Sequence, residues 1–289
     1  MSQPIRLGIS TCPNDTFAFA ALLEHRVDWR GLDFQVELLD IQQLNERLFA
    51  GDFDVAKTSF HAALHLAEET VVLPSGSALG FGVGPLLLAA QPDDAPRARS
   101  QLALCPGRHT TAMMLFQMFY RDTVRVEQAV FSDIMPRLRA GTADFGVCIH
   151  EGRFTWQAEG LSLVEDLGTR WEAETNMPLP LGGLVARRSL LTSQLATIQA
   201  VIHDSLQTAR AAPATALPTM RRYAQAFEDA VLMQHVDLYV NDWTVDLGEV
   251  GREALGMLSR QAKRSGLIEV QAAELQVWQT PDPEPPEHL

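Results

Sequence analysis

The chain has 289 residues, of which 46% are hydrophobic, and both figures favour more than one domain core. Its 36 acidic and 23 basic residues give a formal net charge of −13 at pH 7, and no local basic patch offsets that charge. Because the charge repels phosphate backbones and anionic membrane surfaces, we expect no nucleic acid and no membrane as partners.

The cysteines and the N-terminus indicate the cellular compartment in which the protein works. Cys12, Cys105 and Cys148 are odd in number and far apart, which predicts buried thiols and neither a disulfide framework nor a cysteine metal site. The N-terminus lacks the pattern of a secretory signal, and no apolar run approaches the roughly 20 residues of a membrane helix. We therefore expect a cytoplasmic protein.

Short β-like runs alternate with segments of helical length. Strands are predicted at residues 5–9, 34–39 and 54–57, with helices from Asp15, from Gln42 and after the third strand. This alternation is typical of a parallel sheet covered by helices. The C-terminal part is predicted to be helical over residues 194–211, 218–229, 230–240 and 248–265, with Asp246 as an N-cap.

The first hundred residues resemble the second hundred in two places. Residues 7–16 and 102–111 each fit a strand, a Cys-Pro turn, a polar loop and a helix. Residues 50–59 match 140–150 with one residue inserted in the second copy. In both copies a helix ends at Ala-Gly and an Asp begins a short strand. Two copies predict two similar α/β lobes, whereas an incidental likeness between ordinary α/β segments is the alternative.

Two β-like passages bounded by Gly and Pro, at residues 80–90 and 178–186, are the expected crossings between the lobes. We predict a discontinuous first lobe of residues 1–90 and 188–280. Residues 91–187 would form the second lobe. Residues 281–289, rich in Pro and Glu, should be a disordered tail.

Polar side chains gather where the predicted strands end. In open α/β sheets this edge binds ligands, because helix N-termini there present unpaired N–H groups. Its residues suit a small anionic organic molecule: Asn14, Asp15, Lys57, Thr58, Ser59, Thr110, Thr111, His150 and Arg153. The alternatives are structural: Ser59, Thr110 and Thr111 as simple helix caps, and Lys57 and Arg153 as ion-pair partners of carboxylates.

Histidines are the candidates for chemistry. His150 ends the apolar strand predicted at residues 145–149, which directs it toward the cleft, and the near-neutral pKa of a histidine suits a general base. His61 and His65 have a metal-compatible spacing, but no third ligand is evident, so we expect ordinary helix-face residues and no metal. The Gly-rich residues 80–84 precede a strand, whereas a phosphate loop feeds a helix.

Six motifs in order closely resemble the 1,4-dihydroxy-6-naphthoate synthase family of the futalosine route to menaquinone. They are residues 10–17 (STCPNDTF), 57–59 (KTS), 107–112 (GRHTTA), 149–155 (IHEGRFT), 178–182 (PLPLG) and 238–241 (LYVN). The resemblance covers nearly the whole chain except the tail. It implies a two-lobed fold like the type II periplasmic binding proteins, with the ligand between the lobes.

The same resemblance implies a lyase that converts cyclic dehypoxanthine futalosine to 1,4-dihydroxy-6-naphthoate and releases dihydroxyacetone, without metal or organic cofactor. The family's general base matches His150, and its substrate-binding segments match residues 57–59 and 110–111. A base that removes an acidic proton near the ring ketone starts the opening of the fused sugar. Aromatisation then drives C–C cleavage, so the protein need mainly position the substrate and exclude water.

Two other functions stay open. A two-lobed cleft alone denotes capture, which fits a nonenzymatic solute-binding or sensor protein. Chorismate dehydratase, the neighbouring enzyme of the same pathway, shares the architecture. His150 counts against the first alternative, and residues 13–16 and 150–155 favour the synthase over the second. A homodimer through the C-terminal helices is a further expectation.

Overall fold

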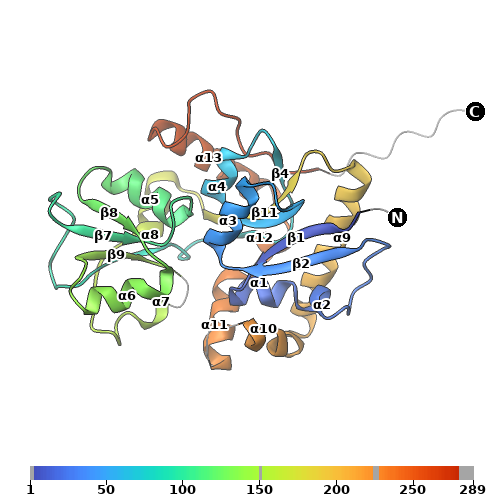
Figure 1. The fold of residues 1–289 in the computed structure, drawn as a ribbon, viewed down its shortest axis with the longest axis horizontal. Coiled ribbons are helices and arrows are strands. Elements are labelled where there is room, and N and C mark those ends of the chain that lie inside the picture. The colour runs from blue at the N-terminus through green and yellow to red at the C-terminus, as the bar shows by residue number, and fades with distance from the viewer. Residues whose placement is uncertain (1–2, 150–151, 224–227, 280–289) are drawn as a thin grey trace, which may run out of the picture.

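The computed structural model describes residues 3–149, 152–223 and 228–279. Figure 1 shows two lobes side by side, each built around its own sheet. Lobe 1 carries both termini of the described chain, and lobe 2 is formed by its middle part, drawn in green. Among the described helices, none combines the length and the apolar character that crossing a membrane requires.

The two sheets share one plan. The sheet of lobe 1 has the order β2-β1-β3-β11-β4, with β5 paired to β11. Its strands are β1 (Ile5–Ser10), β2 (Phe34–Leu39), β3 (Val55–Ser59), β4 (Thr70–Val72), β5 (Ala78–Gly80) and β11 (Leu179–Arg187). The sheet of lobe 2 has the order β10-β6-β9-β7-β8. Its strands are β6 (Leu86–Ala89), β7 (Leu102–Cys105), β8 (Arg125–Gln128), β9 (Phe145–Cys148) and β10 (Ser162–Asp166).

Strand pairing confirms the predicted duplication. Each repeated unit contributes three parallel strands to its sheet, and the first of them in sequence lies in the middle. The order is β2-β1-β3 in lobe 1 and β8-β7-β9 in lobe 2. An antiparallel strand pairs with the third strand of each unit, β11 with β3 and β6 with β9.

The aspartates predicted to begin the third strands are also equivalent. Asp54 accepts a hydrogen bond from the Arg6 N–H at 2.9 Å, and Asp144 accepts one from the Leu102 N–H at 2.6 Å.

The repeated Ala-Gly pairs end equivalent helices. Helix α3 (Ile41–Phe49) is followed by Gly51 at φ 83°, and α6 (Phe131–Arg139) by Gly141 at φ 65°. Glycine adopts this left-handed conformation without steric cost. The Cys-Pro pairs, in contrast, are not equivalent, because Cys105 is the last residue of β7 whereas Cys12 lies beyond the end of β1.

The lobe boundaries differ from the prediction. β6 pairs with strands of lobe 2 and β11 with strands of lobe 1, so the chain crosses before each of these strands. The predicted boundaries, after residues 90 and 187, place each strand in the wrong sheet. An apolar run of four residues does not reveal which sheet it joins. The tail at residues 281–289 lies outside the described residues.

Helices cover both faces of the lobe 1 sheet. On one face, α1 (Pro13–Ala18), α2 (Ala20–Leu23) and α9 (Thr192–Ala211) bury a cluster that contains Leu7 and Ile198. Helices α10 (Leu217–Tyr223) and α11 (Asp229–Tyr239) extend this layer, and α12 (Asp242–Val245) follows. Helices α3, α4 (Phe60–His65) and α13 (Gly248–Arg264) cover the other face. The helices predicted in the C-terminal part are therefore confirmed, apart from bounds and the short α12.

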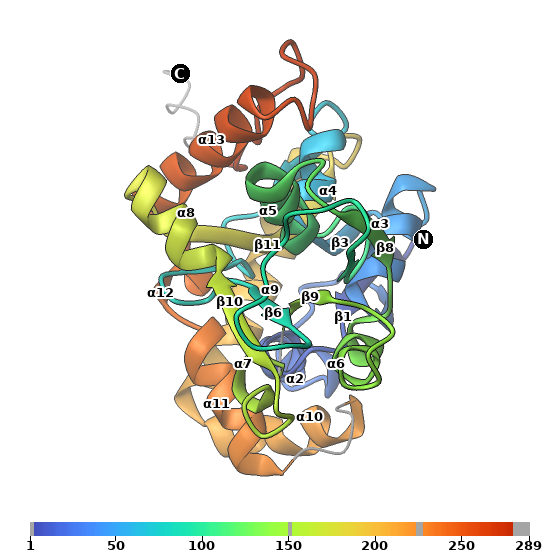
Figure 2. The same ribbon diagram turned by 90° about the vertical axis from the view of Figure 1, so that its left-hand side faces the viewer.

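The apolar cluster under α4 and α13 continues into lobe 2. It joins Phe60 and Leu255 of lobe 1 to Phe116 and Trp171, which lie on α5 (Thr111–Tyr120) and α8 (Leu167–Thr175) of lobe 2. Figure 2, in which lobe 2 faces the viewer, shows α5 in front of β11. The lobes are thus packed together beside their strand ends. Helix α7 (Gly152–Thr155) completes lobe 2.

Candidate functional site

A cavity of about 100 Å³ lies between the lobes, at the strand ends where the sequence predicts it. Lobe 1 contributes the β1–α1 turn, the end of β3 and one face of α11. Lobe 2 contributes residues 83–85, the first residues of α5 and Ile149, and β11 supplies Leu181 and Gly182. Ligand pockets usually enclose roughly 300–1,000 Å³, so this cavity is small for a ligand pocket.

The structure brings most of the predicted site residues together. Those that line the cavity are Asn14, Asp15, Lys57, Ser59, Thr110 and Thr111. Thr58 is buried but does not line it, and Arg153 holds the wall from outside through an ion pair with Asp166 at 2.7 Å and a hydrogen bond to the carbonyl of Gly84. His150, the predicted general base, lies outside the described residues.

Lys57 and Asp15 form a buried ion pair at the lobe 1 end of the cavity. The Lys57 Nζ donates to Asp15 Oδ1 at 2.7 Å and to the Gly76 carbonyl at 2.8 Å, and the two side chains are only 5% and 6% exposed. Burial raises the pKa of Asp15 above its ordinary value, although the Lys57 charge opposes that shift. The ammonium group therefore already has an anionic partner, which is the structural alternative considered for Lys57.

The N-terminus of α5 offers donors to the opposite end of the cavity. Thr110 caps the helix: its hydroxyl accepts from the Met113 N–H at 3.2 Å and donates to the Gly107 carbonyl at 2.8 Å. The Thr111 hydroxyl donates to the Leu181 carbonyl at 2.6 Å. Both hydroxyl protons are thus occupied within the protein. The backbone N–H groups of Thr111 and Ala112 have no acceptor among the described residues.

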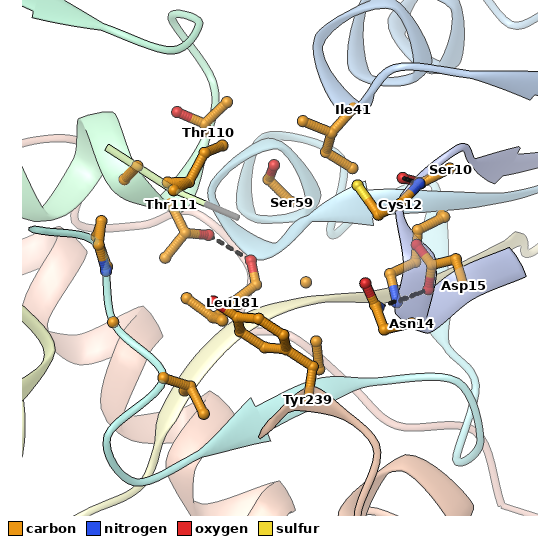
Figure 3. A pocket seen from close by; sticks show the side chains of 18 of the residues that line it. Ser10, Cys12, Asn14, Asp15, Ile41, Ser59, Thr110, Thr111, Leu181 and Tyr239 are labelled. Carbon is orange, nitrogen blue, oxygen red and sulfur yellow. Dashed lines mark hydrogen bonds and ion pairs between the residues drawn. The ribbon is translucent and has the colours of Figure 1, made fainter. Parts of the chain in front are cut away.

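These two N–H groups stand at the positive end of the α5 dipole, and both residues line the cavity. Figure 3 shows Thr110 and Thr111 on one side of the cavity, Ser10, Cys12, Asn14 and Asp15 on the other, and Leu181 and Tyr239 between them. A helix N-terminus of this kind binds carboxylates and phosphates. The cavity therefore has unpaired N–H donors at one end, Leu181 and the ring of Tyr239 in the middle, and polar side chains at the far end.

Helix α11 supplies two lining residues that the site prediction missed, His235 and Tyr239. Their rings lie 4.5 Å apart, and His235 Nε2 is 3.1 Å from Asn14 Oδ1. Since the Asn14 amide nitrogen donates to Asp15 at 3.1 Å, its oxygen faces His235, which must donate through Nε2. Their spacing of four residues puts both on one helix face, a signal present in the sequence but common to buried structural residues.

Cys12, Ser10 and Ile41 are further lining residues outside the predicted set. Cys12 is half-buried, whereas Cys105 and Cys148 are buried as expected, and none of the three takes part in a disulfide. The predicted burial of the thiols is therefore wrong for Cys12. Its place in the turn between β1 and α1 brings it to the cavity instead.

A third histidine lies close to His61 and His65. The ring of His109, from lobe 2, is 6.0 Å from that of His61 and 5.4 Å from that of His65. Burial lowers the pKa of His61 to about 4, and its Nδ1 donates to the Thr110 carbonyl at 3.2 Å. Across the part of the chain that the structure describes, no group of three or more His, Cys, Asp or Glu side chains has the arrangement of a metal site.

Comparisons with known proteins agree with this architecture. Solved structures of low identity share the fold: the periplasmic aliphatic sulphonate binding protein of Escherichia coli superposes with a TM-score of 0.65 at 12% identity, over 100% of this chain and 96% of that one. A protein of Archaeoglobus fulgidus is more similar, with a TM-score of 0.86 and 28% identity over 92% and 98% of the two chains. The predicted periplasmic-binding-protein-like fold is confirmed.

Sequence comparison gives the family. Residues 5–264 match the family model described as menaquinone biosynthesis. The chain is 39% identical over 265 residues to the 1,4-dihydroxy-6-naphthoate synthase of Thermus thermophilus, covering 92% of this chain and 96% of the relative. It is 38% identical over 273 residues to the enzyme of the same name from Streptomyces coelicolor, covering 92% and 95%. The chain therefore belongs to the 1,4-dihydroxy-6-naphthoate synthase family of menaquinone biosynthesis.

Proposed function

We propose that this protein converts cyclic dehypoxanthine futalosine to 1,4-dihydroxy-6-naphthoate and dihydroxyacetone, with His150 as the general base. The observation that carries the proposal is the polarity of the cavity. An anion-binding end at α5 and a polar end at the β1–α1 turn are separated by the side chain of Leu181 and the aromatic ring of Tyr239. A substrate with a carboxylate on an aromatic ring and a sugar-derived part at the other end matches these three regions of the cavity in order.

The carboxylate belongs at the N-terminus of α5 in this proposal. The N–H groups of Thr111 and Ala112 lack acceptors among the described residues, and Ser59 lines the same cavity. Hydrogen bonds from backbone N–H groups to an ionised acceptor are stronger than those between neutral groups. The positive end of the helix dipole also attracts an anion locally, despite the net charge of −13 of the chain.

The sugar-derived part then lies near Asn14, Ser10 and His235. The buried Lys57–Asp15 pair fixes the base of this region, because Asn14 is held by Asp15 on one side and by His235 on the other. These groups offer both donors and acceptors to hydroxyl groups of the substrate. Lys57 and Asp15 contribute through this framework, since each is already the other's charge partner.

His150 is the proposed base for two reasons. It follows Ile149, which lines the cavity, and the family resemblance assigns this position to the base. The reaction needs no other co-reactant, because the proton taken near the ring ketone can be returned to the three-carbon fragment that leaves. Formation of the aromatic diol drives the C–C bond cleavage, so the protein's main task is to position the substrate and exclude water.

The test is a turnover assay on the purified protein with cyclic dehypoxanthine futalosine, in which naphthoate formation is followed by mass and absorbance. We expect turnover, and a loss of about 10²–10⁴ in kcat for His150→Ala at unchanged product affinity. A folded His150→Ala protein with near wild-type kcat would refute the base assignment. Binding without turnover would instead indicate a solute-binding protein, and turnover of chorismate would indicate the neighbouring dehydratase.

Three further expectations remain predictions. We propose a cytoplasmic location, a reaction without cofactor and a homodimer. Cell fractionation, metal and cofactor analysis of the active protein, and light scattering would test them in turn.

A further inference from the structure

Asn45 is a buried polar residue on the apolar face of α3. Its neighbours on that face, Leu44 and Leu48, belong to the core, and Asn45 itself is fully buried without lining the cavity. A buried amide costs free energy unless its donors and acceptors are paired. Among the described residues, both polar atoms of the Asn45 amide bond to β3, at the strand end that forms the cavity.

The hydrogen bonds of Asn45 fix which way its amide points. Oδ1 accepts from the Ser59 backbone N–H at 3.1 Å and from the Thr58 hydroxyl at 2.8 Å, and Nδ2 donates to Ser59 Oγ at 3.2 Å. A backbone N–H can only donate, so the atom that faces it must be the amide oxygen. The amide nitrogen must therefore face the Ser59 hydroxyl.

This orientation decides the role of Ser59. Because the Asn45 amide nitrogen can only donate, Ser59 Oγ is the acceptor in their bond. The Ser59 proton must then be directed elsewhere, and among the described residues it has no acceptor. Ser59 lines the cavity that also contains Thr111 and Ala112. The direction left for its O–H group is toward a ligand.

We propose that Asn45 is a positioning residue that makes Ser59 a hydrogen-bond donor, and so selects a substrate group that is an acceptor, the carboxylate. The inference rests on the proposed function for the identity of the substrate. Together with the two N–H groups of α5, it gives this part of the cavity three hydrogen-bond donors. Three donors favour a ligand group that accepts hydrogen bonds over one that presents N–H or O–H donors at the same place.

The test is Asn45→Asp, which replaces the amide nitrogen by oxygen at almost unchanged volume. The new carboxylate accepts from Ser59, which turns the serine proton away from the cavity. We expect KM for the substrate and Kd for the product to rise about 10- to 100-fold, since a hydrogen bond to a charged group is lost. We expect kcat to change little, because the bond serves ground state and transition state alike.

Ligand preference separates a positioning role from a structural one. Wild type should bind 1,4-dihydroxy-6-naphthoate more tightly than its primary amide, and Asn45→Asp should reduce or invert that preference. In a Ser59→Ala background, Asn45→Asp should add little to the loss of carboxylate affinity. Asn176→Asp, which adds the same charge at the exposed C-cap of α8, is the matched control. Asn45→Ala, which buries no charge, should give a smaller loss that also depends on Ser59.

Two results would overturn the inference. One is an Asn45→Asp protein with wild-type preference between carboxylate and amide. The other is a loss of equal size in the Ser59→Ala background, which would indicate general damage. If wild type shows no turnover but the predicted dependence of binding on Asn45 and Ser59 holds, the proposed function fails while the role of Asn45 stands. If wild type does not prefer the carboxylate at all, the role of Asn45 fails as well.

Discussion

At the scale of single residues, the buried Lys57–Asp15 pair links stability to the site. Replacing Lys57 by Met keeps a long apolar side chain but leaves the Asp15 carboxylate buried without its cation. We expect the free energy of unfolding to fall by about 3–5 kcal/mol, the usual cost of breaking a buried pair by removing one partner. Urea denaturation measures it. The loss should lower the urea concentration at the denaturation midpoint, with little change in the slope of the unfolding free energy against urea concentration.

An exposed pair provides the control for that prediction. Arg99 and Asp122 are 3.3 Å apart, with side chains 75% and 74% exposed. Water screens such a pair, so Arg99→Ala should leave the denaturation midpoint unchanged. A Lys57→Met protein as stable as Arg99→Ala would mean that Asp15 accommodates burial by taking up a proton, in line with the raised pKa that burial gives it.

At the scale of elements, the crossing before β6 depends on contact between two glycines. A Cβ atom on Gly168, in the first turn of α8, would lie 2.6 Å from the Cα of Gly84. Gly84 lines the cavity and receives a hydrogen bond from Arg153. Gly168→Ala should destabilise the protein by about 1–3 kcal/mol, as overpacking does, and raise KM by displacing the cavity wall. Thermal unfolding and steady-state kinetics measure the two effects.

The same substitution in another helix should act in the opposite direction. A Cβ on Gly256, inside α13, meets only the end of the flexible Arg260 side chain, at 3.1 Å. Gly256→Ala should therefore stabilise the protein by up to about 1 kcal/mol through helix propensity. If both variants are equally stable, the Gly84–Gly168 contact does not constrain the crossing.

The elements also show what the sequence can predict. Local patterns predict the first three strands, the repeated Ala-Gly helix ends and six of the residues that line the cavity. These features depend on residues close together in the chain, as at the ends of parallel strands. The partner of a strand is not local, and β6 and β11 therefore fall in lobes other than those predicted. Asn45 and His235 are missed for a related reason: each acts through a contact with residues 14 or more positions away, Ser59 and Asn14.

At the scale of the whole molecule, histidines lie where the two lobes meet. His61 of α4 is 4% exposed and bonds the backbone of Thr110 in lobe 2, and His109 of lobe 2 packs on Phe49 of lobe 1 with ring centroids 4.8 Å apart. Burial, and then the neighbouring His65 and Arg108, lower the pKa of His109, whereas Glu46 raises it by a smaller amount. Protonation here places like charges across the junction of the lobes.

Protonation of His61 in acid should therefore lower the free energy of unfolding. Burial, with smaller contributions from His65 and His109, lowers its folded-state pKa to about 4, below the ordinary value of 6.5. The unfolded state binds the proton more tightly, so stability is complete above pH 6.5 and falls as the pH approaches 4. A difference of 2.5 pKa units corresponds to a loss of about 3 kcal/mol.

Urea denaturation at intervals from pH 7.5 to pH 4.5 measures this slope. His61→Phe removes the titrating group while keeping a ring in the core, so its stability should fall less steeply than that of wild type, even if it starts lower for want of the bond to Thr110. His203→Phe, at a side chain 43% exposed, is the control for the same substitution outside the core. If the free energy of unfolding of wild type and of His61→Phe falls in parallel as the pH is lowered, carboxylates rather than His61 determine the loss of stability in acid.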